Sequence, residues 1–194
     1  MKVENDMDYK IIADSCCDLT DEMKDWGNLA LVPLTLELGD YRIMDDENFD
    51  QDDFIARMQA LGDVPRSACP SPDAFCAAIA ADDAKEVYVL TITDKLSGCY
   101  NSALQGVMLY EDDHPGEKKI HVFNSLATSG LETLIAYEIR RLKDGYDVLD
   151  KLYNSNDLNC DNFAQAVREY HCSREVITAV VNLYLRQQIM IDTY

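Results

Sequence analysis

The feature that most constrains the fold is an apolar segment in the middle of the chain that passes through a polar turn into a helical pattern. Residues 86–92 are rich in β-branched and aromatic side chains and too few for a helix, which predicts a buried strand. Apolar residues recur at helical spacing between positions 103 and 108. The polar stretch 93–102 is therefore expected to connect a strand to a helix.

Ser97 lies in this turn, at or just before the expected start of the helix. A hydroxyl at such a position can cap the helix, while the amides of Gly98 and Cys99 point outward. Free amides at the positive end of a helix dipole favour an anion. The turn alone leaves two explanations open, a simple helix cap and an anion site.

The rest of the chain alternates between strand and helix patterns. Strands are expected over residues 9–13, 29–38, 86–92 and 119–123, and a hairpin turn at Gly39-Asp40 leads into 41–44. Helices are expected between Thr20 and Gly27, from Asp50, from Pro72 with Ser71 as cap, and over 131–142 with Gly145 past the end. This alternation predicts an α/β fold with a mainly parallel sheet and helices on both faces.

Polar pairs follow three of the expected strands directly: Asp14-Ser15, Ser97-Gly98 and Asn124-Ser125. Because the carboxyl ends of parallel strands share an edge, these groups are expected to gather where open α/β sheets bind ligands. Short hydroxyl and amide groups with almost no positive charge suit a polar head attached to a larger apolar body. Ser67 lies in the proline-rich loop 64–72. Its hydroxyl could line a crevice, but the loop sequence by itself favours a hydrogen bond within the loop.

Charge and length limit the partners. The 194 residues fit one domain and a piece of another, and a formal net charge of -19 argues against a nucleic-acid backbone or an anionic membrane surface. Any bound anion must be held by local amides and hydroxyls. Residues 1–10 do not resemble a signal peptide and no apolar run is long enough to span a bilayer, so we expect a cytoplasmic protein.

Metal ions and cofactors are not expected. The seven cysteines (16, 17, 69, 76, 99, 160 and 172) form no C-x-x-C pair, which favours reduced thiols over disulfides or zinc. The acidic run 45–53 imitates the start of an EF-hand loop. Gln51 replaces the required glycine and Arg57 the required glutamate, so a solvated loop is favoured over calcium.

Five short motifs, in order and spacing, resemble the DegV family over roughly residues 9–145. They are Ile11-Ile12-Ala13-Asp14-Ser15 with Asp18-Leu19, Val32-Pro33-Leu34, Ser67-Ala68-Cys69-Pro70-Ser71-Pro72, Leu96-Ser97-Gly98-Cys99-Tyr100-Asn101-Ser102-Ala103, and Phe123-Asn124-Ser125 with Ala127-Thr128-Ser129-Gly130. The resemblance implies a bacterial fatty-acid-binding protein. Some members of the family are the acyl-carrier subunit of a bacterial fatty-acid kinase.

The resemblance also implies a site. In the family, a fatty acid lies in a tunnel between two α/β domains, and a Thr and a Ser hold its carboxylate. The matching positions are Ser67, which keeps the hydroxyl, and Ser97. Cys99 replaces a threonine and is a weaker donor, and Asn124 replaces the usual aspartate. The expected ligand-binding residues are therefore Ser67, Ser97, Gly98, Asp14, Ser15 and Ser125, with no catalytic residue.

The resemblance ends near residue 150. Residues 1–150 are expected to form the lipid-binding domain, and 151–194 a divergent tail in place of a second domain. The tail could cover an exposed face or pair with another subunit. His171 is expected to be a surface residue.

Three functions are compatible with these observations. The first is an acyl carrier that makes and breaks no bond. The second is an enzyme with Ser97 as nucleophile, which the three histidines outside any recognisable motif and the absence of G-x-S-x-G disfavour. The third is a truncated fragment or interaction domain without a ligand.

Overall fold

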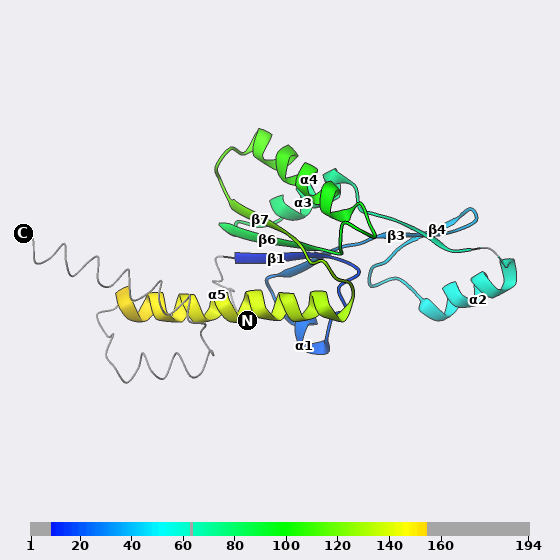
Figure 1. Ribbon diagram of the computed structural model, residues 1–194, viewed down its shortest axis with the longest axis horizontal. Coiled ribbons are helices and arrows are strands. Elements are labelled where there is room, and N and C mark those ends of the chain that lie inside the picture. Colours follow the sequence, from blue (N-terminus) through cyan, green and yellow to red (C-terminus); the bar gives the residue numbers. More distant parts are fainter. Residues whose placement is uncertain (1–8, 63, 155–194) are drawn as a thin grey trace, which may run out of the picture. The chain divides into compact units, whose positions relative to one another are not determined.

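The computed structural model describes residues 9–62 and 64–154 (Figure 1). They fall into two compact units, one up to Leu134 and one from Ile135 onward. The elements in chain order are β1 (Tyr9–Asp14), α1 (Asp21–Lys24), β2 (Leu29–Val32), β3 (Thr35–Leu38), β4 (Tyr41–Met44), α2 (Gln51–Leu61), β5 (Arg66–Ala68), α3 (Pro72–Ala80), β6 (Glu86–Thr91), α4 (Cys99–Asp113), β7 (Lys119–Asn124) and α5 (Gly130–Asn154). The expected tail beyond residue 154 lies outside the described residues, so the domain boundary near residue 150 stays a prediction. No helix in the described ranges is both long and apolar enough to cross a bilayer.

The main sheet is parallel, as predicted, with strand order β2-β1-β6-β7. The central strand β6 pairs with β1 through Val89 and Ile12 and with β7 through Val89 and Val122. The apolar run that predicted a buried strand is thus paired on both sides. Its valines at 87 and 89 are fully buried.

Helices α3 and α4 lie together on one face of this sheet, and α1 lies on the other (Figure 1). Phe75 and Ile79 of α3 and Ala103 of α4 pack on Ile12 and Val89 of the sheet. The two helices meet at Gly106, where an added Cβ would lie 2.7 Å from both the Phe75 Cβ and the Pro72 carbonyl oxygen. A glycine is required there because the helix backbones approach too closely for any side chain.

The expected single strand over 29–38 is wrong, because two strands of different sheets occupy it. β2 belongs to the parallel sheet, whereas β3 pairs antiparallel with β4 and β5. The break falls at Pro33, which has no amide hydrogen for a ladder. The next amide, that of Leu34, donates to the Ser15 hydroxyl at 3.0 Å. The hairpin turn at Gly39-Asp40 is confirmed, with Gly39 at φ 58°.

Most helix starts are confirmed by their caps. Thr20, Asp50 and Ser71 each accept the amide three residues ahead, at 3.3, 3.0 and 3.2 Å. Two helix ends differ from expectation. The first helix ends at Lys24, before Gly27. The last runs through Gly145 to Asn154, because one interior glycine costs a helix only about 1 kcal/mol.

Candidate functional site

The turns that follow β1, β6 and β7 meet at one edge of the parallel sheet. Asp14 joins the first two turns, because its Oδ2 accepts the Ile92 amide at 2.8 Å. The Ser125 amide donates to the Thr91 carbonyl at 3.1 Å and joins the second turn to the third. The polar pairs predicted from the sequence therefore lie along one continuous edge.

Asp14 and Ser15 have structural partners at this edge. Asp14 is fully buried, and its second oxygen accepts the Cys16 amide at 3.0 Å. Burial raises the pKa of Asp14, and the two amide bonds partly offset that rise. Ser15 binds the Leu34 amide through its hydroxyl. Asp14 thus joins the end of β1 to the residue after β6, and Ser15 joins it to the segment after β2. Both side chains have a structural role at this edge.

The turn before α4 differs from expectation in its cap. Gly98 is the N-cap of α4 and provides no side-chain hydrogen bond, so Ser97 is not the cap residue. The Ser97 hydroxyl instead donates to the Cys99 sulfur at 3.1 Å and accepts the Cys99 amide at 3.3 Å. The Gly98 amide makes no hydrogen bond within the described ranges, and Gly98 is exposed. The groups available to an anion are thus the Gly98 amide and a Ser97 hydroxyl that can rotate away from sulfur.

Ser67 lies on an exposed edge strand, β5, of the smaller sheet. The loop that follows it reaches the turn before α4. A Cβ on Gly98 would lie 3.2 Å from the Cys69 sulfur, and the Ser102 hydroxyl donates to the Pro70 carbonyl at 2.5 Å. The fold therefore brings together the two segments that carry Ser67 and Ser97. No hydrogen bond joins the two hydroxyls in the described part of the chain.

Asn124 and Ser125 shape the third turn. The Asn124 side-chain oxygen accepts the amides of Asp94 and Leu126 at 3.3 and 3.2 Å. The Ser125 hydroxyl donates to the Ala127 carbonyl at 3.0 Å and accepts the Ala127 amide at 3.1 Å. Leu126 is held at φ 54°, a left-handed conformation that a leucine rarely adopts. These bonds present the Leu126 side chain to solvent, where it is 73% exposed.

Two apolar side chains at this edge were missed from the sequence. Leu96, in the turn before α4, is also 73% exposed. The signal was present, because Leu96 and Leu126 are single large apolar residues within otherwise polar turns. Beneath them, Leu34, Ile92 and Cys99 form a small buried cluster. The edge thus combines neutral polar donors with exposed apolar surface, which suits an amphiphile.

A buried acid near this edge was also missed. Glu132, in the first turn of α5, is fully buried. Burial, followed by the charge of Asp14, raises the pKa of Glu132 to about 8. Its neighbour Thr133 donates its hydroxyl to the Asp18 carbonyl at 2.6 Å, which places this turn against the segment after β1.

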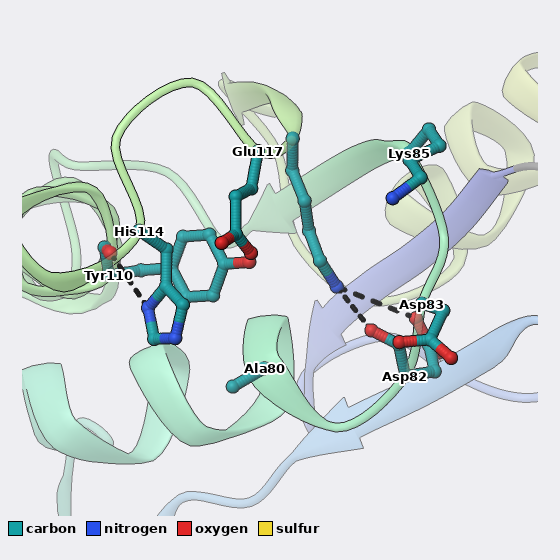
Figure 2. Close-up of a pocket in the computed structure, with 8 residues that line it drawn as sticks. Ala80, Asp82, Asp83, Lys85, Tyr110, His114 and Glu117 are labelled. Atoms are coloured by element: carbon teal, nitrogen blue, oxygen red, sulfur yellow. Dashed lines mark hydrogen bonds and ion pairs between the residues drawn. The ribbon is translucent and has the colours of Figure 1, made fainter.

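Two cavities outside the turn before α4 fit a fatty acid poorly. A cleft of about 900 Å³ includes Ser15, but four acids (Asp18, Asp45, Asp46 and Glu47) line it with a single lysine, Lys24. A cavity of about 200 Å³ at the other end of the sheet is lined by Tyr110, His114, Lys118 and Asp82. Figure 2 shows His114 beside Tyr110, with Asp82 and Asp83 on the opposite side of the cavity. The Lys118 ammonium there binds the Ile79 carbonyl at 2.7 Å and so caps the end of α3. The charge of Lys118 is thus already paired with Asp82 and with a helix end.

Two acids of the EF-hand-like run accept hydrogen bonds from nearby backbone amides. Asp46 accepts the Asn48 amide at 2.9 Å, and Asp50 caps α2. Across the residues that the structure describes, no group of three histidine, cysteine or acidic side chains is placed to hold a metal ion. The five cysteines in this part, Cys16, Cys17, Cys69, Cys76 and Cys99, are free thiols.

Comparison with known proteins identifies relatives that are all described as DegV proteins. A sequence model described as "Uncharacterised protein, DegV family" matches residues 8–171. A DegV domain-containing protein of Streptococcus pneumoniae is 39% identical over 140 residues, which are 71% of this chain and 49% of the relative. One from Streptococcus gordonii is 33% identical over 174 residues, 88% of this chain and 57% of the relative. The chain spans about half the length of these curated relatives.

Solved structures agree with this match. A DegV-family protein from Ruminococcus gnavus, solved with vaccenic acid, matches with a TM-score of 0.65 and 34% identity over 85% of this chain and 54% of its own. The Streptococcus pneumoniae Fatty Acid Kinase (Fak) B3 protein, loaded with linoleic acid, matches with a TM-score of 0.57 and 33% identity over 84% of this chain and 53% of its own.

Proposed function

Because this chain belongs to the DegV family, we propose that it binds a long-chain fatty acid at the carboxyl edge of its parallel sheet. The carboxylate is held by the Ser97 hydroxyl and the Gly98 amide, with Ser67 on the opposite side. Leu96 and Leu126 contact the start of the acyl chain. The observation that carries the proposal is the convergence of two distant segments, with Cys69 against Gly98.

The electrostatics of the edge support neutral donors for the head group. The chain has a net charge of -19, and the pair Ser97-Gly98 lies at the start of the long helix α4. A helix start favours an anion, and the Gly98 amide points away from the helix ladder. The Ser97 hydroxyl would exchange a weak bond to sulfur for a stronger charged one.

The proposed role is that of a lipid carrier without catalysis. A serine nucleophile needs a base within hydrogen-bond reach. His114 stacks on Tyr110 and His121 on Tyr88, and neither contacts Ser97 in the part of the chain described. Burial raises the pKa of the neighbouring Cys99 to about 12, so this thiol is neutral and a poor nucleophile.

We further propose that the protein presents the bound acid to a fatty-acid kinase. It is supported by the similarity to the Streptococcus pneumoniae protein that carries the kinase name. A second candidate is a DegV-like domain that binds no lipid. It is favoured by the bonds of the Ser97 hydroxyl, which already joins the Cys99 sulfur and amide.

Extraction and titration separate these alternatives. We expect mass spectrometry of solvent-extracted purified protein to detect a stoichiometric long-chain acid. After delipidation, Ser97→Ala and Ser67→Ala should bind myristic acid about 5- to 100-fold more weakly, because one hydroxyl to a charged group contributes about 1–3 kcal/mol. Both variants should lose less affinity for myristyl alcohol.

Thr128→Ala provides the control, because Thr128 is an exposed hydroxyl residue in the turn after β7. Its affinity for the acid should equal that of the unmodified protein. Equal losses for acid and alcohol in the serine variants would remove the assigned head-group site. Failure of the unmodified protein to bind either ligand would favour the domain without lipid.

A further inference from the structure

Glu132 is a buried acid whose carboxyl group is not hydrogen-bonded by any residue in the described ranges. Its side chain is fully buried, and neither carboxylate oxygen has a partner among the residues described. An ionised carboxylate in such a place would lose its hydration without compensation, at a cost of several kcal/mol. The folded protein therefore favours the neutral acid, in agreement with a pKa raised to about 8.

Helix capping does not explain this residue. The sequence Ser129-Gly130-Leu131-Glu132 matches a capping box, in which the glutamate would accept the amide of the serine. Ser129 instead has φ 57°, and its hydroxyl donates to the Asp18 carboxylate. The Ser129 amide lies near enough to lower the pKa of Glu132, but it makes no hydrogen bond of good geometry with either oxygen. Within residues 9–62 and 64–154, helix capping thus leaves the Glu132 carboxyl group unsatisfied.

The groups that face Glu132 are acids and thiols. Asp14 comes from the end of β1 and Asp18 from the turn after it, and both charges raise the pKa of Glu132. The thiols of Cys16 and Cys17 are close enough for the charge of Glu132 to raise their own pKa values. No cation within the described ranges offsets a negative charge on Glu132.

Asp14 connects Glu132 to the proposed head-group site. Its carboxylate binds the Ile92 amide at the end of β6 and interacts with the thiol of Cys99, the first residue of α4. The Cys99 amide and sulfur in turn contact the Ser97 hydroxyl. A charge gained by Glu132 therefore acts on the head group through the buried residues Asp14 and Cys99.

We infer that Glu132 carries a proton at neutral pH and that this proton sets how strongly the turn at Gly98 holds an anionic head group. This inference rests on the proposed function. Loss of the proton places a second negative charge beside Asp14, behind the turn, and weakens binding of a carboxylate. By reciprocity, a bound carboxylate raises the proton affinity of Glu132. A neutral ligand of the same chain length is unaffected.

The test compares myristic acid with myristyl alcohol between pH 6.5 and 9.5 for three proteins. These are the unmodified protein, Glu132→Gln, whose amide imitates the neutral acid, and Glu138→Gln, which removes an exposed acid on the same helix. We expect acid affinity of the unmodified protein to fall about 5- to 30-fold across this range relative to Glu132→Gln. Glu138→Gln should follow the unmodified protein. At each pH the ligand has the same protonation state in solution for all three proteins. The ratio of their affinities therefore reflects a change in the protein and not in the ligand.

Two buried thiols near Asp14 do not titrate in this comparison, and the exposed Cys69 is common to all three proteins. Burial places the pKa of Cys17 at about 11 and that of Cys99 at about 12, above the range tested. If acid binding has the same pH dependence in Glu132→Gln as in the unmodified protein, the inference is wrong and the proposed function stands. If neither ligand binds at any pH, both are wrong. Should Glu132→Gln fail to fold, the Glu132 carboxyl is titrated by NMR in the unmodified protein: a pKa that rises when myristic acid binds supports the inference, and a pKa that does not change overturns it.

Discussion

The carboxylate of Asp14 accepts the backbone amide of Ile92 at 2.8 Å, across 78 positions in the sequence. This bond extends the pairing of β1 with β6 by one residue and ties Asp14 to the start of the turn that carries Ser97. Because Asp14 is fully buried and also binds the Cys16 amide, both oxygens are committed to backbone donors.

We expect Asp14→Asn to lower the free energy of unfolding by about 2–4 kcal/mol, because the amide nitrogen would face a backbone donor and a charge-assisted bond would be lost. Asp50→Asn is the matched control, since asparagine is an equally good cap for α2. Its stability should change by less than about 0.5 kcal/mol. Equal stability of the two variants in urea unfolding would show that the buried bond contributes little.

The close contact between α3 and α4 predicts a large effect of one methyl group. Gly106→Ala places a Cβ 2.7 Å from the Phe75 Cβ and the Pro72 carbonyl oxygen, so the helices must separate. The expected loss is about 1–3 kcal/mol, although alanine favours helix by about 1 kcal/mol. Gln105→Ala, at an exposed position of the same helix, should not destabilise. A thermally more stable Gly106→Ala protein would contradict the contact.

The buried Glu132 predicts how stability depends on pH. Its pKa is about 8 in the folded protein, against an ordinary value of 4.5, so the folded state holds a proton that the unfolded state releases between these values. The free energy of unfolding should therefore fall as pH rises from about 4.5 to 8, by on the order of 2–4 kcal/mol from this group. Glu132→Gln should be relatively more stable at pH 9 than at pH 5. Parallel stability curves for the two proteins would contradict the assignment.

The thiols are expected to differ in reactivity. Cys69 is exposed, whereas Cys17 and Cys99 are buried with raised pKa values. Alkylation of the native protein at pH 8, followed by peptide mass mapping, should modify Cys69 first. Denaturation without reductant should reveal seven thiols. Rapid native modification of Cys99, or fewer than seven thiols, would contradict the prediction.

Three residues or segments differ from what their local sequence predicts. Residues 29–38 have uniform strand propensity, yet Pro33 and the Ser15 hydroxyl divide them between two sheets. Ser97 has the right residue type for a cap, but the turn places Gly98 in that position. Glu132 looks like a surface acid in sequence, and its burial depends on the segment after β1. A partner distant in sequence decided the first and the third outcome, and the conformation of the turn decided the second.

The sequence by itself determined the β6 strand, the turn after it, the start of α3 and the parallel arrangement of strands, because hydrophobic period, proline and cap residues act over a few neighbouring positions. It also placed three polar turns at one sheet edge, because parallel strands must end together. Only the tertiary structure decided that the loop after Ser67 meets Gly98, that Asp14 is committed to Ile92, and that Glu132 is buried beside Asp14. Those outcomes depend on packing between segments tens of residues apart, and no local pattern encodes the burial of a particular carboxyl group.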